Sequence, residues 1–127
     1  MAVTHITTVR NTLAEAIRTL ANAGAAAPKL FIGTSSLALP STGVLATITL
    51  GGDFGAASNG VITATGASAT ASASGTAALC IVTDSNNVDV FHGAVSTSGA
   101  EVNLSSLSIT SGDTVTITGN VTYTAPA

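Results

Sequence analysis

Hydrophobic residues near the start of the chain recur at intervals of three and four positions, which places their side chains on one face of an α-helix. The series is Ile6, Val9, Leu13, Ile17 and Leu20. It predicts one amphipathic helix over residues 4–23, with Thr4 as its N-cap and Gly24 as its C-cap, and Pro28 prevents the helix from resuming. The apolar stripe is narrow, so we expect it to pack on the sheet or on a neighbouring subunit.

From Lys29 onward the hydrophobic period changes to two, which is typical of β-strands. The predicted strands are 29–33, 44–50, 61–65, 76–84, 88–95, 101–104, 107–109 and 114–124. We predict a mainly β fold, an antiparallel β-sandwich or jelly roll of about eight short strands preceded by one N-terminal α-helix. The chain forms a single domain over residues 1–127, with the β-sandwich over 29–124.

The predicted connections are rich in turn-forming residues. Residues 35–43, which include Pro40, and the glycine-rich residues 51–60 are expected to be loops. Ser85-Asn86-Asn87 suits a hairpin turn, and Gly119 suggests a bulge or kink in the last strand. The low-complexity segment 64–75 is expected to be a mobile surface loop, with a sparse edge strand as the alternative.

Charged residues make up only 7% of the chain, against about 25% in typical domains. The net charge is −3, and Arg10, Arg18 and Lys29 are its only basic residues, so we exclude direct nucleic-acid binding. We expect no membrane span and no signal peptide, and synthesis in a cytoplasm. Because water solvates such a surface weakly, copies of the chain or a partner should cover it, which favours a homo-oligomer.

Residues that could carry chemistry are dispersed. His92 lies near Asp89 and Ser96 but is interpreted as a half-buried strand histidine, and Cys80 as a small buried hydrophobe. The segment 84–89 superficially resembles a calcium loop, but a polar hairpin tip explains it. We predict that the chain is not an enzyme and that it has no catalytic, cofactor-binding or metal-binding residues and no cofactor.

Three segments carry a family resemblance. They are the helix running into Pro28–Ile32; Thr42–Leu50 with Phe54–Ala57; and Gly75–Ala77 with Thr83–Ser85, Thr97–Leu104 and Gly112–Thr118. On these segments the chain resembles short proteins encoded in the structural modules of tailed bacteriophages. It departs from them at Leu79-Cys80-Ile81, where related sequences often carry a Trp-Phe-Arg-like run.

The resemblance implies a virion protein, made in the host cytoplasm, that acts as a capsid decoration or cement protein. Such proteins sit on the outer capsid surface, often as trimers, and stabilise contacts between capsomers. The implied partners are the major capsid protein or other virion proteins. The alternatives are a tail, collar or head-fibre subunit, and a carbohydrate-binding β-sandwich module, which usually needs exposed aromatic residues.

Overall fold

The computed structural model describes residues 5–39 and 41–125, which form one helix, α1 (Thr7–Ala21), and eleven strands. The strands are β1 (Lys29–Ala38), β2 (Thr42–Thr49), β3 (Val61–Thr65), β4 (Ser68–Thr70), β5 (Gly75–Thr76), β6 (Leu79–Thr83), β7 (Asp89–Ser96), β8 (Val102–Asn103), β9 (Ser108–Ile109), β10 (Thr114–Thr116) and β11 (Asn120–Thr124). The fold is therefore mainly β with one N-terminal helix, as the sequence predicts.

The largest sheet has five strands in the order β2-β1-β6-β7-β8. Its neighbours are antiparallel except for β7 and β8, which are parallel over two residue pairs. The interior strand β1, between β2 and β6, is buried at Leu30, Phe31, Ile32 and Gly33 in succession. Side chains alternate between the two faces of a strand, so this run means that both faces of the sheet are covered at β1.

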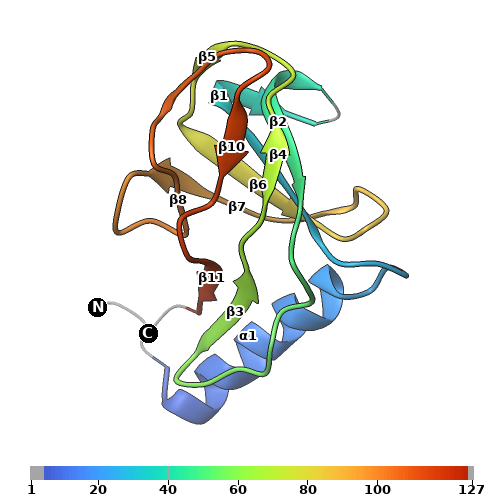
Figure 1. Ribbon diagram of the computed structural model, residues 1–127. Helices are drawn as coiled ribbons and strands as arrows, with labels where there is room; N and C mark the ends of the chain where they lie inside the picture. The colour runs from blue at the N-terminus through green and yellow to red at the C-terminus, as the bar shows by residue number, and fades with distance from the viewer. Residues whose placement is uncertain (1–4, 40, 126–127) are drawn as a thin grey trace.

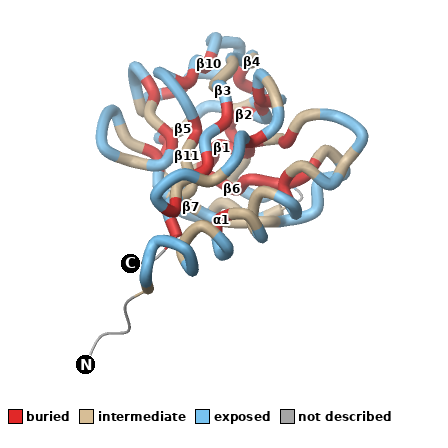
Figure 2. Tube along the Cα trace, turned by 90° about the horizontal axis from the view of Figure 1, so that it is seen from below, coloured by how far each residue is buried: buried red, intermediate tan, exposed pale blue. Residues whose placement is uncertain are grey.

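Three further antiparallel pairs, β4 with β10, β3 with β11 and β5 with β9, curl around the same core (Figure 1). Hydrogen bonds from loop backbone tie the pairs to the large sheet; for example, the Ser72 amide donates to the Leu45 carbonyl over 2.8 Å. The buried positions lie along the inside of this curled arrangement (Figure 2). Helix α1 packs against β3 and β7 at one end of the molecule.

The predicted hairpin is confirmed at its turn, but the predicted strand 76–84 is two strands, because β5 pairs with β9 and only β6 pairs with β7. Strands β6 and β7 pair antiparallel on either side of the turn, and Asn87 adopts a φ of 65°, a left-handed conformation that Asn tolerates. The predicted irregularity at Gly119 is also confirmed, because this residue has a φ of 80° and separates β10 from β11. The predicted last strand, 114–124, is therefore two strands that pair with different neighbours.

Two segments expected to be loops contain strands instead. Within 35–43, β1 continues to Ala38, which pairs with Thr42 at the start of β2; Pro40 lies outside the described residues. Within 64–75, β4 pairs with β10, and Ala69 lies opposite the buried Val115. A strand of small side chains gives no hydrophobic alternation in the sequence, although its backbone pairs with a neighbouring strand like that of any other strand.

The helix is shorter than predicted at both ends. It begins after Ile6, whose backbone is extended, and Thr4, the predicted N-cap, lies outside the described residues. It ends at Ala21, and Asn22 rather than Gly24 is its C-cap. Gly24 has another purpose, because a Cβ atom there would lie 1.6 Å from the Ser85 hydroxyl of the hairpin turn. A side chain at this position would push the helix end away from that turn.

Candidate functional site

The ionisable groups of the β-region do not assemble into a cluster. Among residues 5–39 and 41–125, no three His, Cys, Asp or Glu side chains lie close enough to hold a metal ion. His92 and Asp89 do meet, with Nε2 and Oδ2 2.6 Å apart, but their side chains are 63% and 48% exposed. The interpretation of His92 as half-buried is thus wrong: the pair lies on the solvent side of β7.

The calcium-like segment is a hairpin turn held by its first residue. The Asp84 carboxylate oxygen Oδ1 accepts hydrogen bonds from the amides of Asn86, at 2.8 Å, and Val88, at 3.0 Å. Asp84 is itself buried, and the adjacent Thr83 is fully buried. This carboxylate therefore satisfies the backbone of the turn, as Asp commonly does in turns.

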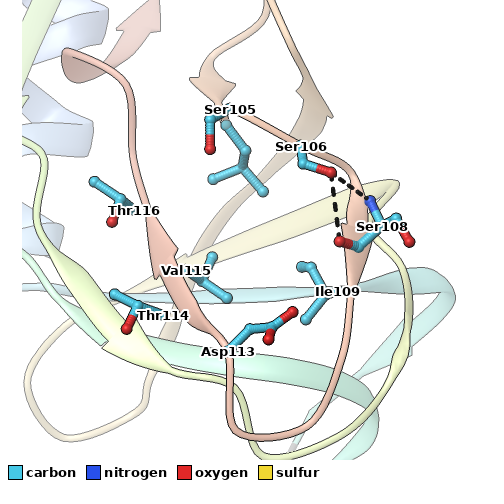
Figure 3. A pocket seen from close by; sticks show the side chains of 9 residues that line it. Ser105, Ser106, Ser108, Ile109, Asp113, Thr114, Val115 and Thr116 are labelled. Atoms are coloured by element: carbon cyan, nitrogen blue, oxygen red, sulfur yellow. Dashed lines mark hydrogen bonds between the residues drawn. The ribbon is translucent and has the colours of Figure 1, made fainter.

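A pocket of about 230 Å³ lies between β9, β10 and the segment that precedes β9 (Figure 3). Its lining consists of Leu104, Ser105, Ser106, Ser108, Ile109, Asp113, Thr114, Val115 and Thr116. The Asp113 carboxylate accepts a hydrogen bond from the Thr110 amide at 2.9 Å, and the Ser106 hydroxyl accepts one from the Ser108 amide at 3.2 Å. These hydrogen bonds tie both groups to the backbone of their own turns.

Cys80 is buried in the centre of the large sheet, as predicted. Burial, with a smaller contribution from the negative charge of Glu101, raises the pKa of its thiol to about 12. The nucleophilic thiolate is therefore scarce at neutral pH. This side chain is a packing residue in the folded protein.

Helix α1 is attached to the rest of the molecule through its polar side chains. The Asn22 amide group both donates to the Phe54 carbonyl and accepts from the Phe54 amide, each at 3.0 Å. Asn11 accepts from the Gly60 amide at 2.7 Å, and Arg10 donates to the carbonyl of Ala125. The helix thus satisfies backbone groups of Phe54 and Gly60 in the 51–60 connection, while Gly51 and Gly55 donate to strand β3.

Glu15 and Arg18 complete this attachment. The Glu15 carboxylate accepts a hydrogen bond from the Ala57 amide at 2.6 Å and pairs with Arg18 at 2.8 Å. The Ala57 amide first, and Arg18 second, lower the pKa of Glu15. Arg18 in turn donates to the Phe54 carbonyl at 3.0 Å. Only the small residues Ala14 and Ala21 are fully buried on this face, which lets the helix approach closely.

The consequence of this attachment is that the apolar stripe of α1 faces outward. Ile6, Val9, Leu13 and Leu20 are 70, 40, 38 and 56% exposed, and we call these four residues the helix ridge. Ile17, the fifth member of the stripe, is half-buried and packs against the core. Figure 2 shows α1 at the outside of the molecule, with exposed positions along its outer side.

Sequence reasoning identified the ridge residues but not their orientation. Packing of the stripe on the sheet, one of the two expectations, is wrong, because the polar side of the helix occupies that position. The expectation that remains is packing on another molecule. The available signal was the run of Asn11, Glu15, Arg18 and Asn22, which shares one helix face and offers several donors and acceptors to a backbone with unpaired groups.

Comparison with known proteins gave no match: no family model, no curated protein and no solved structure matches the chain. The resemblance to phage structural proteins therefore stays a prediction. No helix among the described residues is long and apolar enough to cross a membrane. The helix ridge is the feature that most clearly distinguishes this surface from that of a self-contained domain, and it is our candidate functional site.

Proposed function

We propose that the chain is a non-enzymatic structural protein of a virion, a capsid decoration or cement protein. In this role it binds the outer surface of a capsid and stabilises contacts between capsomers, with the major capsid protein or other virion proteins as partners. It would be made in the host cytoplasm and reside in the virion. We also propose that the curled β-region belongs to the sandwich or jelly-roll class; the antiparallel pairs around one core support this.

The observation that carries the proposal is the helix ridge on a nearly uncharged protein. Exposed aliphatic side chains that share a face cost free energy in water, and such patches commonly mark contacts between proteins. The chain carries only nine charged side chains, three basic and six acidic, so few charges oppose close packing of neighbours. Each contact can be weak, because a repeating shell adds many of them together.

The aromatic residues favour this role over carbohydrate binding. Sugar-binding modules use exposed aromatic rings as platforms, but Phe31 and Phe54 are buried here. The Phe91 ring lies 6.2 Å from Phe54 and 5.1 Å from Tyr123, measured between ring centroids, in a tilted stack that packs against the core. Phe91 and Tyr123 are half-buried, so none of the four rings is an exposed platform of the kind that sugar-binding modules use. A tail, collar or head-fibre subunit remains the alternative within the virion.

Mass spectrometry of purified particles from the source tests the proposal. We expect the chain in the particles at a copy number comparable to that of the major capsid protein. Particles stripped of the chain should bind it again. Stripped capsids should disassemble at a lower temperature than capsids that carry the chain. Absence of the chain from purified particles would overturn the proposal, and a copy number far below that of the shell would favour the tail or collar.

A further inference from the structure

We propose that the Asn59-Gly60 dipeptide is a site of spontaneous deamidation, and that helix α1 keeps this site closed through Asn11. The inference concerns the polar side of α1 rather than the helix ridge, and it does not depend on the proposed function. Three observations carry it: the dipeptide itself, the hydrogen bond that holds the Gly60 amide, and the enclosure of Gly60 by its neighbours.

The dipeptide combines an exposed asparagine with a glycine that follows it. Asn59 is the one asparagine in the chain that precedes a glycine. It is exposed to water, whereas Gly60 is buried. Asparagine is thermolabile, and a following glycine has no Cβ atom to hinder its backbone nitrogen from approaching the asparagine side chain. Asn59 is therefore the asparagine whose sequence most favours deamidation.

The reaction takes place within the dipeptide. The backbone nitrogen of Gly60 loses its proton and attacks Cγ of Asn59. A bond forms between these two atoms, the bond from Cγ to the side-chain nitrogen breaks, and ammonia leaves with the proton. Water then opens the cyclic succinimide at either carbonyl, which gives aspartate or isoaspartate. Asparagine and water are consumed, and aspartate or isoaspartate and ammonia are formed, so the reaction needs no other reactant.

Asn11 of helix α1 holds the nitrogen that would react. The Gly60 amide donates its proton to Oδ1 of Asn11 over 2.7 Å. Attack requires this nitrogen to give up its proton and to turn toward the Asn59 side chain. Neither can happen while the amide donates to Asn11, and a buried amide that loses its partner is costly. The hydrogen bond therefore suppresses the reaction directly.

The turn that contains the dipeptide is closed on both sides. Ser58 and Val61 exchange two backbone hydrogen bonds, each of 3.0 Å. Between them, Asn59 and Gly60 have φ angles of 52° and 76°, as in the tight hairpin turns that Asn-Gly favours. The turn precedes β3 and lies beside the first half of α1 (Figure 1). Its backbone is thus fixed by hydrogen bonds within the turn as well as by the helix.

Arg10 and the end of the last strand enclose Gly60 further. The Gly60 carbonyl accepts a hydrogen bond from the Ala125 amide at 2.8 Å, and Arg10 donates to the Ala125 carbonyl. Arg10 also covers Gly60, since a Cβ atom on this glycine would lie 3.0 Å from Cβ and Nε of Arg10. Deamidation therefore requires an open form in which α1 has left the turn, and its rate is proportional to the population of that form.

The isoaspartate product would weaken the attachment of the helix. Its main chain runs through the former side-chain carboxyl and is longer by one carbon atom between residues 59 and 60. A two-residue turn closed by the Ser58–Val61 hydrogen bonds has no room for that atom. The altered turn moves the Gly60 amide away from Asn11, so each modified molecule loses one of the contacts that hold α1.

Mass spectrometry of the peptide that contains residue 59 measures the rate in the full-length chain. We expect the folded chain to deamidate at least about ten-fold more slowly than the same chain unfolded in guanidinium chloride. Asn11→Ala should react about five-fold faster than the wild type, the change that loss of one typical hydrogen bond produces. Asn11→Asp keeps the acceptor oxygen and should react no faster than the wild type. Thr12→Ala, at the exposed neighbouring position, is the matched control and should leave the rate unchanged.

Two further measurements keep the test independent of how well the variants fold. Far-UV circular dichroism establishes that Asn11→Ala retains its helix, and hydrogen exchange of the wild-type Gly60 amide reports the same opening without any substitution. The isoaspartyl fraction should melt at a lower temperature than the unmodified chain. The inference is overturned by equal deamidation of the folded and unfolded chains, by equal rates for Asn11→Ala and Asn11→Asp, or by a Gly60 amide that exchanges like an unprotected one.

Discussion

Strand β1 and helix α1 attach to the same molecule by opposite means. The strand buries consecutive large apolar side chains inside the five-stranded sheet, between β2 and β6. The helix instead buries Ala14 and Ala21 together with a set of hydrogen-bonding side chains, and leaves its large apolar residues outside. The comparison teaches that the hydrophobic face of a helix is not always its inner face. Where a loop exposes unpaired backbone groups, polar side chains can determine which side of a helix turns inward.

The largest expected effect is on the free energy of unfolding, and it distinguishes strand β1 from the outer side of helix α1. Ile32→Ala removes a fully buried side chain from β1 and should reduce the free energy of unfolding by about 2 to 5 kcal/mol. Leu13→Ala on the ridge should change it by less than about 0.5 kcal/mol, as is usual for surface positions. Urea unfolding at a few micromolar protein measures both. Equal losses would show that Leu13 is a core residue.

A smaller loss should follow from breaking the attachment of the helix. Asn22→Ala leaves the amide of the buried Phe54 without its partner, and we expect a loss of about 1 to 3 kcal/mol in the free energy of unfolding. Asn86→Ala, at an exposed position in the hairpin turn, is the control and should have little effect. If the two variants were equally stable, hydrogen bonds would not be what holds the helix.

The contribution of Glu15 should depend on pH. Its pKa in the folded protein is below the ordinary value of 4.5, so its stabilising effect is present above that value and is lost as the pH falls through the lowered pKa. The melting temperature of Glu15→Gln should therefore be below that of the wild type at pH 7, and the difference should shrink below about pH 4. Thr12→Gln, an exposed neutral change, should shift the curve equally at every pH.

The smallest expected effect is at Leu20, and it contrasts the exposed and buried sides of helix α1. Leu20→Gln, on the ridge, should leave the free energy of unfolding within about 0.5 kcal/mol of the wild type. Ala21→Leu, one position further and fully buried, should cost about 1 to 3 kcal/mol, because the enlarged side chain has no space. Thermal denaturation of the two variants tests this. A costly Leu20→Gln with a tolerated Ala21→Leu would mean that the helix is rotated.

The sequence predicted the elements whose patterns are local. The hairpin around Asn87 and the strand over Val61–Thr65 follow from alternation and turn chemistry, and Gly119 breaks the last strand as expected. Strand β4 was only the alternative to a loop, because Ser68–Thr70 has no large apolar residue, and pairing with β10 depends on residues more than forty positions away. Such long-range pairing leaves no signal in a local window.

The candidate site was predicted in its residues but not in its exposure. The stripe of Ile6 to Leu20 is plain in the sequence, and the alternative of packing on a neighbouring subunit was open from the start. Its orientation depends on contacts from Asn22 to Phe54 and from Glu15 to Ala57, which join segments about thirty to forty residues apart. The run of polar residues on one helix face hinted at such contacts, but their partners exist only once the 51–60 connection is folded, so the helical pattern alone did not decide which face turns inward.

The orientation of α1 is the physical basis of the whole account, and thiol labelling in dilute solution tests it most directly. We expect Leu13→Cys to react with a maleimide at nearly the rate of a free thiol, whereas Ala14→Cys, one position away but fully buried, reacts only as fast as the helix detaches. A protected Leu13→Cys beside a reactive Ala14→Cys would place the ridge inside the protein and contradict the account.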